Sequence, residues 1–126
     1  MNDSHTLGPL GENAAAEHLR KKGYRILERN YRFRRKEIDI IALDRGMLCF
    51  IEVKTRTTPE KGDPLEAVTL RKQLEIIKAA KAYLAASGNM ERECRFDVIA
   101  VRLHSPESGS GPFSIEHVTN AFWAAQ

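Results

Sequence analysis

Three charged residues stand at unusual places in this sequence, inside otherwise apolar stretches. Asp39 lies in the apolar run 38–43, Glu52 lies near the end of the apolar run 47–53, and Lys54 follows that run directly. Burying a charge without a partner costs several kcal/mol. Carboxylate oxygens are the ligands that Mg²⁺ prefers, usually one or two of them together with water and substrate phosphate. The three residues therefore indicate a divalent-metal site, although a structural ion-pair cluster would use the same residue types.

The turn between the two runs decides whether these charges meet. Strand side chains alternate between faces with a period of two, and residues 44–46 are a hairpin signal. An even loop sets Asp39 opposite Glu52, and an odd loop sends them to opposite faces. The even register also sets Glu37 opposite Lys54. We expect the even loop, because it alone gathers the charges, with opposed Cβ atoms about 5 Å apart.

The chemistry that these residues could perform is metal-assisted hydrolysis of a phosphodiester. That reaction needs a Lewis acid, an activated water and neutralisation of the developing charge. Lys54 follows Glu52 by two residues and is expected on the same face. Its compact ammonium group suits the positioning of an attacking water or the stabilisation of a phosphorane.

Two predicted helices add residues to this site. Glu12 lies on the same helical stripe as the apolar Leu19, so its carboxylate should point toward the sheet. Gln73 falls within the apolar stripe of a later helix that includes Ile77, and Lys72 lies at the edge of that stripe. Gln73 and Lys72 are therefore expected to reach the same site or a substrate phosphate.

Basic residues gather just before Glu37-Ile38-Asp39. The formal net charge of +3 permits nucleic-acid binding without requiring it. Arg56 continues the alternation of Lys54 and is expected to contact phosphates at the rim of the site. The basic stretch either lines a DNA groove or forms a solvated edge strand. It contains Arg29, Arg32, Arg34, Arg35 and Lys36, interleaved with Tyr31 and Phe33.

The hydrophobic pattern predicts a single α/β domain, residues 1–126, with a mixed sheet flanked by helices. Its core is residues 8–103, followed by a mobile loop at 104–112 and a C-terminal strand and helix at 113–126. Phe122 and Trp123 are expected to seal the core. The predicted order is helix 8–22, strands 24–34, 37–44 and 47–55, loop 57–63, helix 64–87, strand 95–103, edge strand 113–118 and a short helix 120–125.

Several classes of protein are disfavoured. No apolar run is long enough to span a membrane, and no signal peptide is apparent, which favours the cytoplasm. Cys49 and Cys94 lack the spacing of a zinc site and are expected to be small buried hydrophobes. The four histidines show no ligand spacing and are expected on the solvated surface. No small-molecule cofactor is indicated.

The order of these residues resembles the PD-(D/E)XK nuclease signature, in which an Asp on one strand precedes Glu-X-Lys on the next. Twelve residues separate Asp39 from Glu52-Val53-Lys54. Ile38 stands where many members of that superfamily have Pro. Further motifs across residues 8–103 resemble the bacterial YraN-like family. They are Gly11-Glu12, Gly23-Tyr24, Asn30-Tyr31-Arg32, Glu37-Ile38-Asp39-Ile40-Ile41-Ala42, Phe50-Ile51-Glu52-Val53-Lys54-Thr55-Arg56, Glu66-Ala67-Val68, Arg71-Lys72-Gln73 and Ala82-Tyr83-Leu84.

The YraN-like family is similar to archaeal Holliday-junction resolvases and shares their restriction-endonuclease-like fold. The resemblance implies metal ligation by Asp39 and Glu52, a catalytic Lys54, and Glu12 as an auxiliary carboxylate. The metal would be Mg²⁺, with Mn²⁺ as a substitute. The implied activity is endonucleolytic cleavage of structured, branched DNA, and a homodimer would suit symmetric cutting of two strands. The alternatives are a non-catalytic nucleic-acid-binding module and an interaction subunit in DNA processing.

Overall fold

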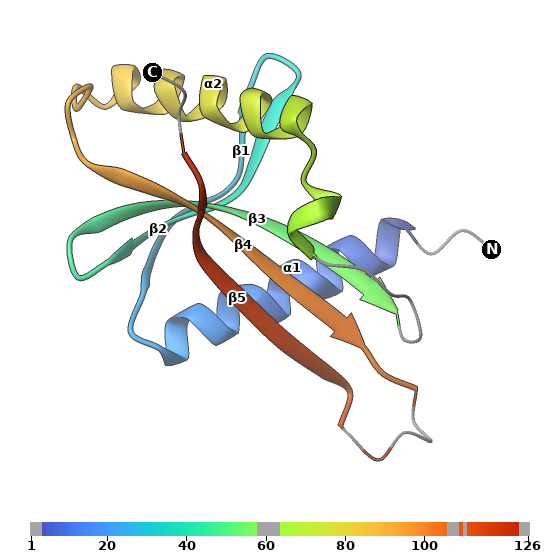
Figure 1. Ribbon diagram of the computed structural model, residues 1–126. Coiled ribbons are helices and arrows are strands. Elements are labelled where there is room, and N and C mark those ends of the chain that lie inside the picture. Colours follow the sequence, from blue (N-terminus) through green and yellow to red (C-terminus); the bar gives the residue numbers. More distant parts are fainter. Residues whose placement is uncertain (1–3, 58–63, 106–108, 110, 124–126) are drawn as a thin grey trace.

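The computed structural model describes residues 4–57, 64–105, 109 and 111–123, except the side chains of residues 4–7 and 64. The elements follow the predicted order as far as the last strand, with a short 3₁₀ turn added before the second helix (Figure 1). They are α1 (Ser4–Lys21), β1 (Arg25–Phe33), β2 (Lys36–Asp44), β3 (Met47–Thr57), η1 (Pro64–Ala67), α2 (Leu70–Ala86), β4 (Cys94–Leu103) and β5 (Phe113–Phe122).

The five strands form one mixed sheet in the order β1-β2-β3-β4-β5. The strands β3 and β4 are parallel, and the other neighbouring pairs are antiparallel. A parallel pair requires a crossover connection, which η1 and α2 supply. This arrangement confirms the predicted α/β class and is consistent with a restriction-endonuclease-like core.

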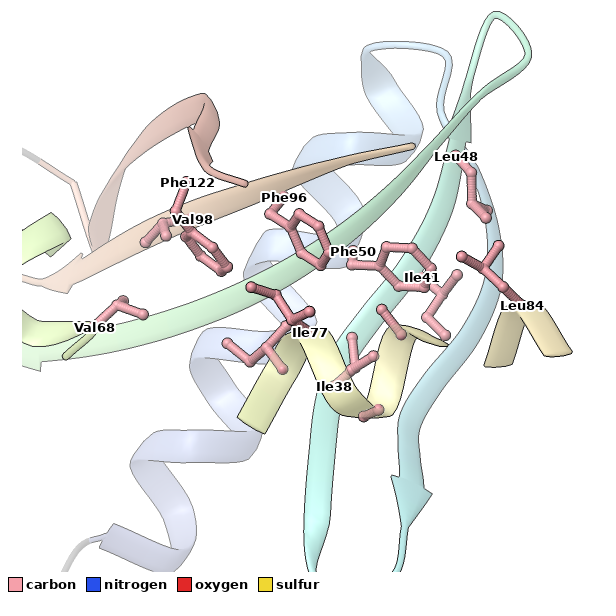
Figure 2. Packing of buried hydrophobic residues seen from close by; sticks show 13 residues of the cluster. Ile38, Ile41, Leu48, Phe50, Val68, Ile77, Leu84, Phe96, Val98 and Phe122 are labelled. Carbon is pink, nitrogen blue, oxygen red and sulfur yellow. The ribbon is translucent and has the colours of Figure 1, made fainter. Parts of the chain in front are cut away.

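The two α-helices cover opposite faces of the twisted sheet (Figure 1). On one face, α2 packs against a cluster in which Phe50, Phe96 and Ile77 meet between helix and sheet (Figure 2). On the other face, α1 contributes Ala16 and Leu19 to a second cluster. Strands covered on both sides need apolar residues at successive positions, which explains the nearly continuous apolar runs of β2 and β3.

The hairpin between β2 and β3 has the even loop that the sequence predicted. Asp44 pairs with Met47, and the two residues between them have left-handed φ angles, 52° at Arg45 and 87° at Gly46. Two left-handed residues form the tight turn that matches the twist of the flanking strands. The predicted register follows, because Leu43 pairs with Leu48.

The alternation of faces slips by one residue at Asp39. Ile38 and Ile41 both pack in the cluster under α2, whereas Ile40 packs in the cluster under α1. A regular strand would place Ile38 and Ile40 on the same face. The alternation of faces is therefore broken between Ile38 and Ile40, at Asp39.

The single helix predicted at 64–87 is wrong, because the segment divides into η1 and α2. Thr69 is the N-cap of α2, with an extended backbone and a side chain that accepts a hydrogen bond from Lys72 N. The Gln73 side chain donates to Val68 O at 3.0 Å. Capping by a threonine competes with continuation of a helix, and this explains the break.

The C-terminal helix predicted at 120–125 is also wrong, since β5 continues to Phe122 and residues 124–126 lie outside the described part. Phe122 is buried against Phe96, with ring centroids 5.2 Å apart, as expected. Trp123 is 68% exposed and does not seal the core. The predicted mobile loop at 104–112 and loop at 57–63 fall partly outside the described residues, although His104 N donates to Pro112 O at 2.9 Å.

Candidate active site

The predicted charges lie where the ladder between β2 and β3 ends. We call this place, formed by Asp39 on β2 and by Glu52 and Lys54 on β3, the fork. Their ladder ends at the pair Ile40–Ile51, one residue short of Asp39 and Glu52. Beyond that point a side chain replaces the backbone acceptor, because Asp39 Oδ2 accepts a hydrogen bond from Val53 N at 2.8 Å. The two carboxylates are thus close neighbours without being a ladder pair, and the ladder likewise does not extend to Glu37 and Lys54.

The surroundings of Asp39 disfavour its charged form. Burial raises the pKa of Asp39 to about 8, and the negative charge of Glu52 acts in the same direction. The charges of Glu12 and Glu37 add to this effect, while the hydrogen bond from Val53 opposes it. Such a carboxyl group keeps its proton at neutral pH unless a cation balances the charge. The fork is therefore a place where a positive charge would be strongly favoured.

Glu52 is the buried partner in this pair, with 5% of the residue exposed. The Lys54 ammonium lies 3.4 Å from Glu52 Oε2, and the Lys72 ammonium lies 4.0 Å from the same oxygen. The other oxygen, Oε1, is buried and has no hydrogen-bond partner among the described residues. Most buried acceptors are satisfied in native proteins, so this oxygen is available to a ligand.

Lys72 and Gln73, both predicted near the site, have different positions. Lys72 reaches Glu52 from the first turn of α2. The Gln73 amide is instead bonded to Val68 O, where it holds the junction between η1 and α2. Gln73 thus fixes the start of the helix that carries Lys72.

Glu12 approaches the fork from α1. Its Oε1 accepts a hydrogen bond from Asn30 Nδ2 at 2.9 Å and lies 3.8 Å from Arg29 Nη2. The approach of α1 is close because Gly11 packs against Thr55 on β3, where a Cβ on residue 11 would overlap with the threonine side chain. The fork therefore receives groups from both faces of the sheet.

The donor set fits a divalent cation that keeps several water ligands. Within the described ranges no three His, Cys, Asp or Glu side chains form a metal-binding group, so Glu12 does not complete a cluster with Asp39 and Glu52. Two carboxylates are nevertheless what Mg²⁺ usually takes from a protein. The unpartnered Glu52 Oε1 supplies one ligand atom, and Asp39 supplies the second carboxylate.

The arginines predicted to bind nucleic acid lie on or next to β1 and β3. Arg32 faces Glu37 across β1 and β2 at 3.9 Å, and 75% of the arginine side chain is exposed. The Arg34 guanidinium lies 5.2 Å from the centroid of the Phe33 ring, and Arg35 is exposed. Arg56, two residues beyond Lys54 on β3, donates to Thr55 O at 3.2 Å.

A second buried carboxylate, Asp97 on β4, was missed by the sequence analysis. It is fully buried and accepts hydrogen bonds from Arg95 Nε at 3.0 Å, His117 Nε2 at 2.9 Å and Asn120 N at 2.9 Å. Burial alone would raise the pKa of Asp97, but the bonds from His117, Arg95 and Asn120 outweigh it and keep the pKa below its usual range. A charged residue between the apolar Phe96 and Val98 is the signal that could have revealed it.

This Asp97 cluster also corrects the expectation for one histidine. His117 is not on the solvated surface, since only 4% of its side chain is exposed. Arg95 links the cluster to Asp44 at 3.2 Å and to the Tyr24 hydroxyl at 2.6 Å. The cluster thus joins β4, β5 and the end of β2 to Tyr24, which lies between α1 and β1. It is a structural ion-pair network of the kind that was considered for Asp39 and Glu52.

The other histidines with described side chains and both cysteines are buried or partly buried. His18 and His104 are partly buried, and the His5 side chain lies outside the described part. Cys49 is buried, as expected, and Cys94 is partly buried. No helix in the described part of the chain combines the length and apolar character needed to cross a membrane.

Comparisons with known proteins agree on one family. Residues 11–101 match the model described as "Uncharacterised protein family UPF0102". A UPF0102 protein of Chlorobium phaeobacteroides (strain BS1) is 61% identical over 119 residues, which cover 94% of each chain. One of Prosthecochloris aestuarii is 57% identical over 121 residues, covering 95% of each chain. One of Trichlorobacter lovleyi is 51% identical over 120 residues, covering 94% of this chain and 91% of the relative. The chain therefore belongs to the UPF0102 family, which is the YraN family.

Proposed function

We propose that this protein is a divalent-metal-dependent endonuclease that hydrolyses phosphodiester bonds in structured DNA, with branched DNA as its substrate class. The observation that carries the proposal is the pair of neighbouring carboxylates Asp39 and Glu52, in which one oxygen of the buried Glu52 has no hydrogen-bond partner among the described residues and Lys54 lies alongside. A purely structural ion pair is expected to satisfy its acceptors. An unsatisfied pair beside a lysine is typical of a functional site.

Each residue at the fork has a role in this proposal. Asp39 and Glu52 would hold Mg²⁺ or Mn²⁺, with Glu12 as an auxiliary carboxylate. When bound, the ion supplies a Lewis acid and neutralises charge on the phosphate. Lys54 extends its ammonium to within 3.4 Å of Glu52 Oε2. From there it would orient the attacking water and stabilise the negative charge that develops on the phosphoryl oxygens.

The surrounding basic residues would bind the DNA backbone. Lys72 is held over Glu52 by the capped start of α2, a position from which it can contact the phosphate next to the scissile bond. Gln73 would act by fixing that start of the helix, and Arg56 by contacting phosphate at the rim. Arg32, Arg34 and Arg35 would follow the backbone further from the site, so affinity should fall with rising salt.

The test is cleavage of four-way junctions, flapped duplexes, linear duplexes and single strands with Mg²⁺ or Mn²⁺. We expect cleavage of branched DNA that stops when the metal is chelated. Asp39→Asn and Lys54→Ala should each lower the rate by about 100-fold or more. Lys78→Ala is the matched control, because Lys78 lies on the exposed face of α2 and should leave the rate unchanged. Cleavage that persists in Asp39→Asn would contradict the proposal.

The same experiment distinguishes the alternative of a non-catalytic nucleic-acid-binding module or interaction subunit. A binding module would bind DNA in a salt-dependent way and would lose this binding when Arg32, Arg34 and Arg35 are replaced. It would cleave no substrate with either metal. A cytoplasmic location and a two-fold dimer that presents two sites to a junction belong to the endonuclease proposal. Sedimentation with and without junction DNA would measure the oligomeric state.

A further inference from the structure

We propose that Asn30 is a positioning residue, which holds the Glu12 carboxylate at the fork and thereby raises the affinity of the Asp39 and Glu52 site for a divalent cation. This inference rests on the proposed function. Asn30 carries no charge and lies within a segment that the sequence predicts as a strand, so no role was predicted for it.

The position of Asn30 follows from the register of β1 and β2. Arg29 pairs with Ile40, and Tyr31 pairs with Ile38, so Asn30 is the residue opposite Asp39. Its backbone is left-handed, with a φ of 54°. Residues other than glycine rarely adopt this conformation, and asparagine is among those that tolerate it best. An irregular residue on each strand thus lies beside the candidate active site.

The left-handed backbone turns the Asn30 side chain toward α1. In a regular strand Arg29 and Tyr31 would share one face, and Asn30 would point to the other. Here Arg29 donates to Asn13 on α1 at 2.8 Å, whereas Tyr31 packs in the cluster under α2. The alternation therefore slips at Asn30, as it does at Asp39. Because of this slip, Asn30 follows Arg29 to the α1 side.

On that side Asn30 meets Glu12. Asn30 Nδ2 donates to Glu12 Oε1 at 2.9 Å, and Arg29 Nη2 lies 3.8 Å from the same oxygen. The hydrogen bond from Asn30 and the nearby positive charge of Arg29 fix the direction of the carboxylate and keep it beside the fork. Outer partners that orient the carboxylates of a metal site typically change metal affinity by about 10- to 100-fold when they are removed.

The test separates the side chain of Asn30 from its backbone. Asn30→Gly keeps the left-handed conformation and removes the amide group. The matched control is Asn120→Gly, because Asn120 on β5 is also left-handed, with a φ of 53°, but lies beside Asp97. Mn²⁺ affinity is measured by calorimetry and thermal midpoints by circular dichroism. We expect Asn30→Gly to weaken Mn²⁺ binding by about 10-fold without a lower midpoint, and Asn120→Gly to leave the affinity unchanged.

A double-mutant cycle with Glu12→Ala tests whether Asn30 acts through Glu12. If it does, Asn30→Gly causes no further loss of Mn²⁺ affinity once Glu12 has been replaced. In the metal-free protein, the NMR signals of the Asn30 side-chain amide should also shift in Glu12→Ala. Unchanged Mn²⁺ affinity in Asn30→Gly, or losses that simply add in the double variant, would overturn this inference alone. A wild-type protein that binds no Mn²⁺ would overturn the proposed function together with it.

Discussion

Glu52 and Asp97 are both buried carboxylates on central strands, yet their surroundings are opposite. Both oxygens of Asp97 accept hydrogen bonds, and Arg95 balances its charge. Glu52 has one oxygen without a partner in the described structure, and its neighbour Asp39 is a second carboxylate. One region is a satisfied polar network, and the other is a pair of neighbouring carboxylates with an unsatisfied acceptor and two lysines alongside.

The difference shows how a structural use of buried charge can be told from a functional one. The pKa of Asp97 lies below its usual range and that of Asp39 lies well above, although burial acts in the same direction on both. A satisfied network rigidifies the fold. An unsatisfied pair costs stability, and proteins retain such pairs mainly at sites where a ligand completes them. The predictions below test this contrast.

The largest effect is expected in the satisfied region. Asp97→Asn removes the charge that balances Arg95 and places an amide donor next to the hydrogen-bond donors Arg95, His117 and Asn120. It should lower the free energy of unfolding by about 3 kcal/mol, measured by urea denaturation. Mn²⁺ affinity should not change, since Asp97 is not at the fork. A stability loss below about 1 kcal/mol would show that the network is not structural.

The approach of α1 to the fork can be disturbed without changing any charge. Gly11→Ala forces a Cβ against the Thr55 side chain and should lower stability by about 2 kcal/mol, as overpacking does. Because Glu12 is adjacent, Mn²⁺ binding should weaken as well. Ala14→Gly is a control on the same helix that lowers stability without a clash. If that control weakens Mn²⁺ binding equally, the close contact is not what matters.

The contribution of Asp39 to the free energy of unfolding should depend on pH. Between an unfolded pKa of about 4 and the folded pKa of about 8, the unfolded chain releases a proton that folded Asp39 retains. Stability from this group is therefore present at low pH and is lost as the pH rises through 8. Relative to wild type, metal-free Asp39→Asn should gain on the order of 1 kcal/mol or more between pH 5 and pH 8. An unchanged difference across that range would contradict the raised pKa.

The smallest effect is expected at Glu37, which the predicted register set opposite Lys54. Its actual neighbour is the exposed Arg32 at 3.9 Å, and exposed ion pairs contribute little. Glu37→Gln should change stability by less than about 0.5 kcal/mol and leave DNA cleavage nearly intact. A large loss of cleavage would bring Glu37 into the active site.

Much of the fold followed from local signals in the sequence. The register of β2 and β3 depended only on a two-residue turn, and Gly46 is the residue type that such a turn requires. The same register brought Asp39 to the end of the ladder beside Glu52. Both results rest on alternation and turn length, which a sequence displays directly.

The remaining features depend on contacts between distant segments. The Asp97 cluster joins His117 and Asn120 to β4 across about twenty residues of sequence, and no spacing rule links them. The slip at Asn30 and Asp39 also appears only when two strands are paired. The end of the C-terminal strand, residues 120–122, was mistaken for the start of a helix because Asn120 and Phe122 are bonded or packed to β4 rather than stabilised locally.

The contrast between the two regions is tested most directly by a calorimetric titration of Mn²⁺ at pH 7 into wild type, Asp39→Asn and Asp97→Asn. Repeating it in buffers of different ionisation enthalpy counts the protons released. We predict that wild type and Asp97→Asn bind Mn²⁺ with similar affinity and release protons on binding, because the cation displaces the proton that Asp39 holds. Asp39→Asn should show no binding. Absence of binding to wild type, or equal binding to Asp39→Asn, would contradict the assignment of the fork as a metal site.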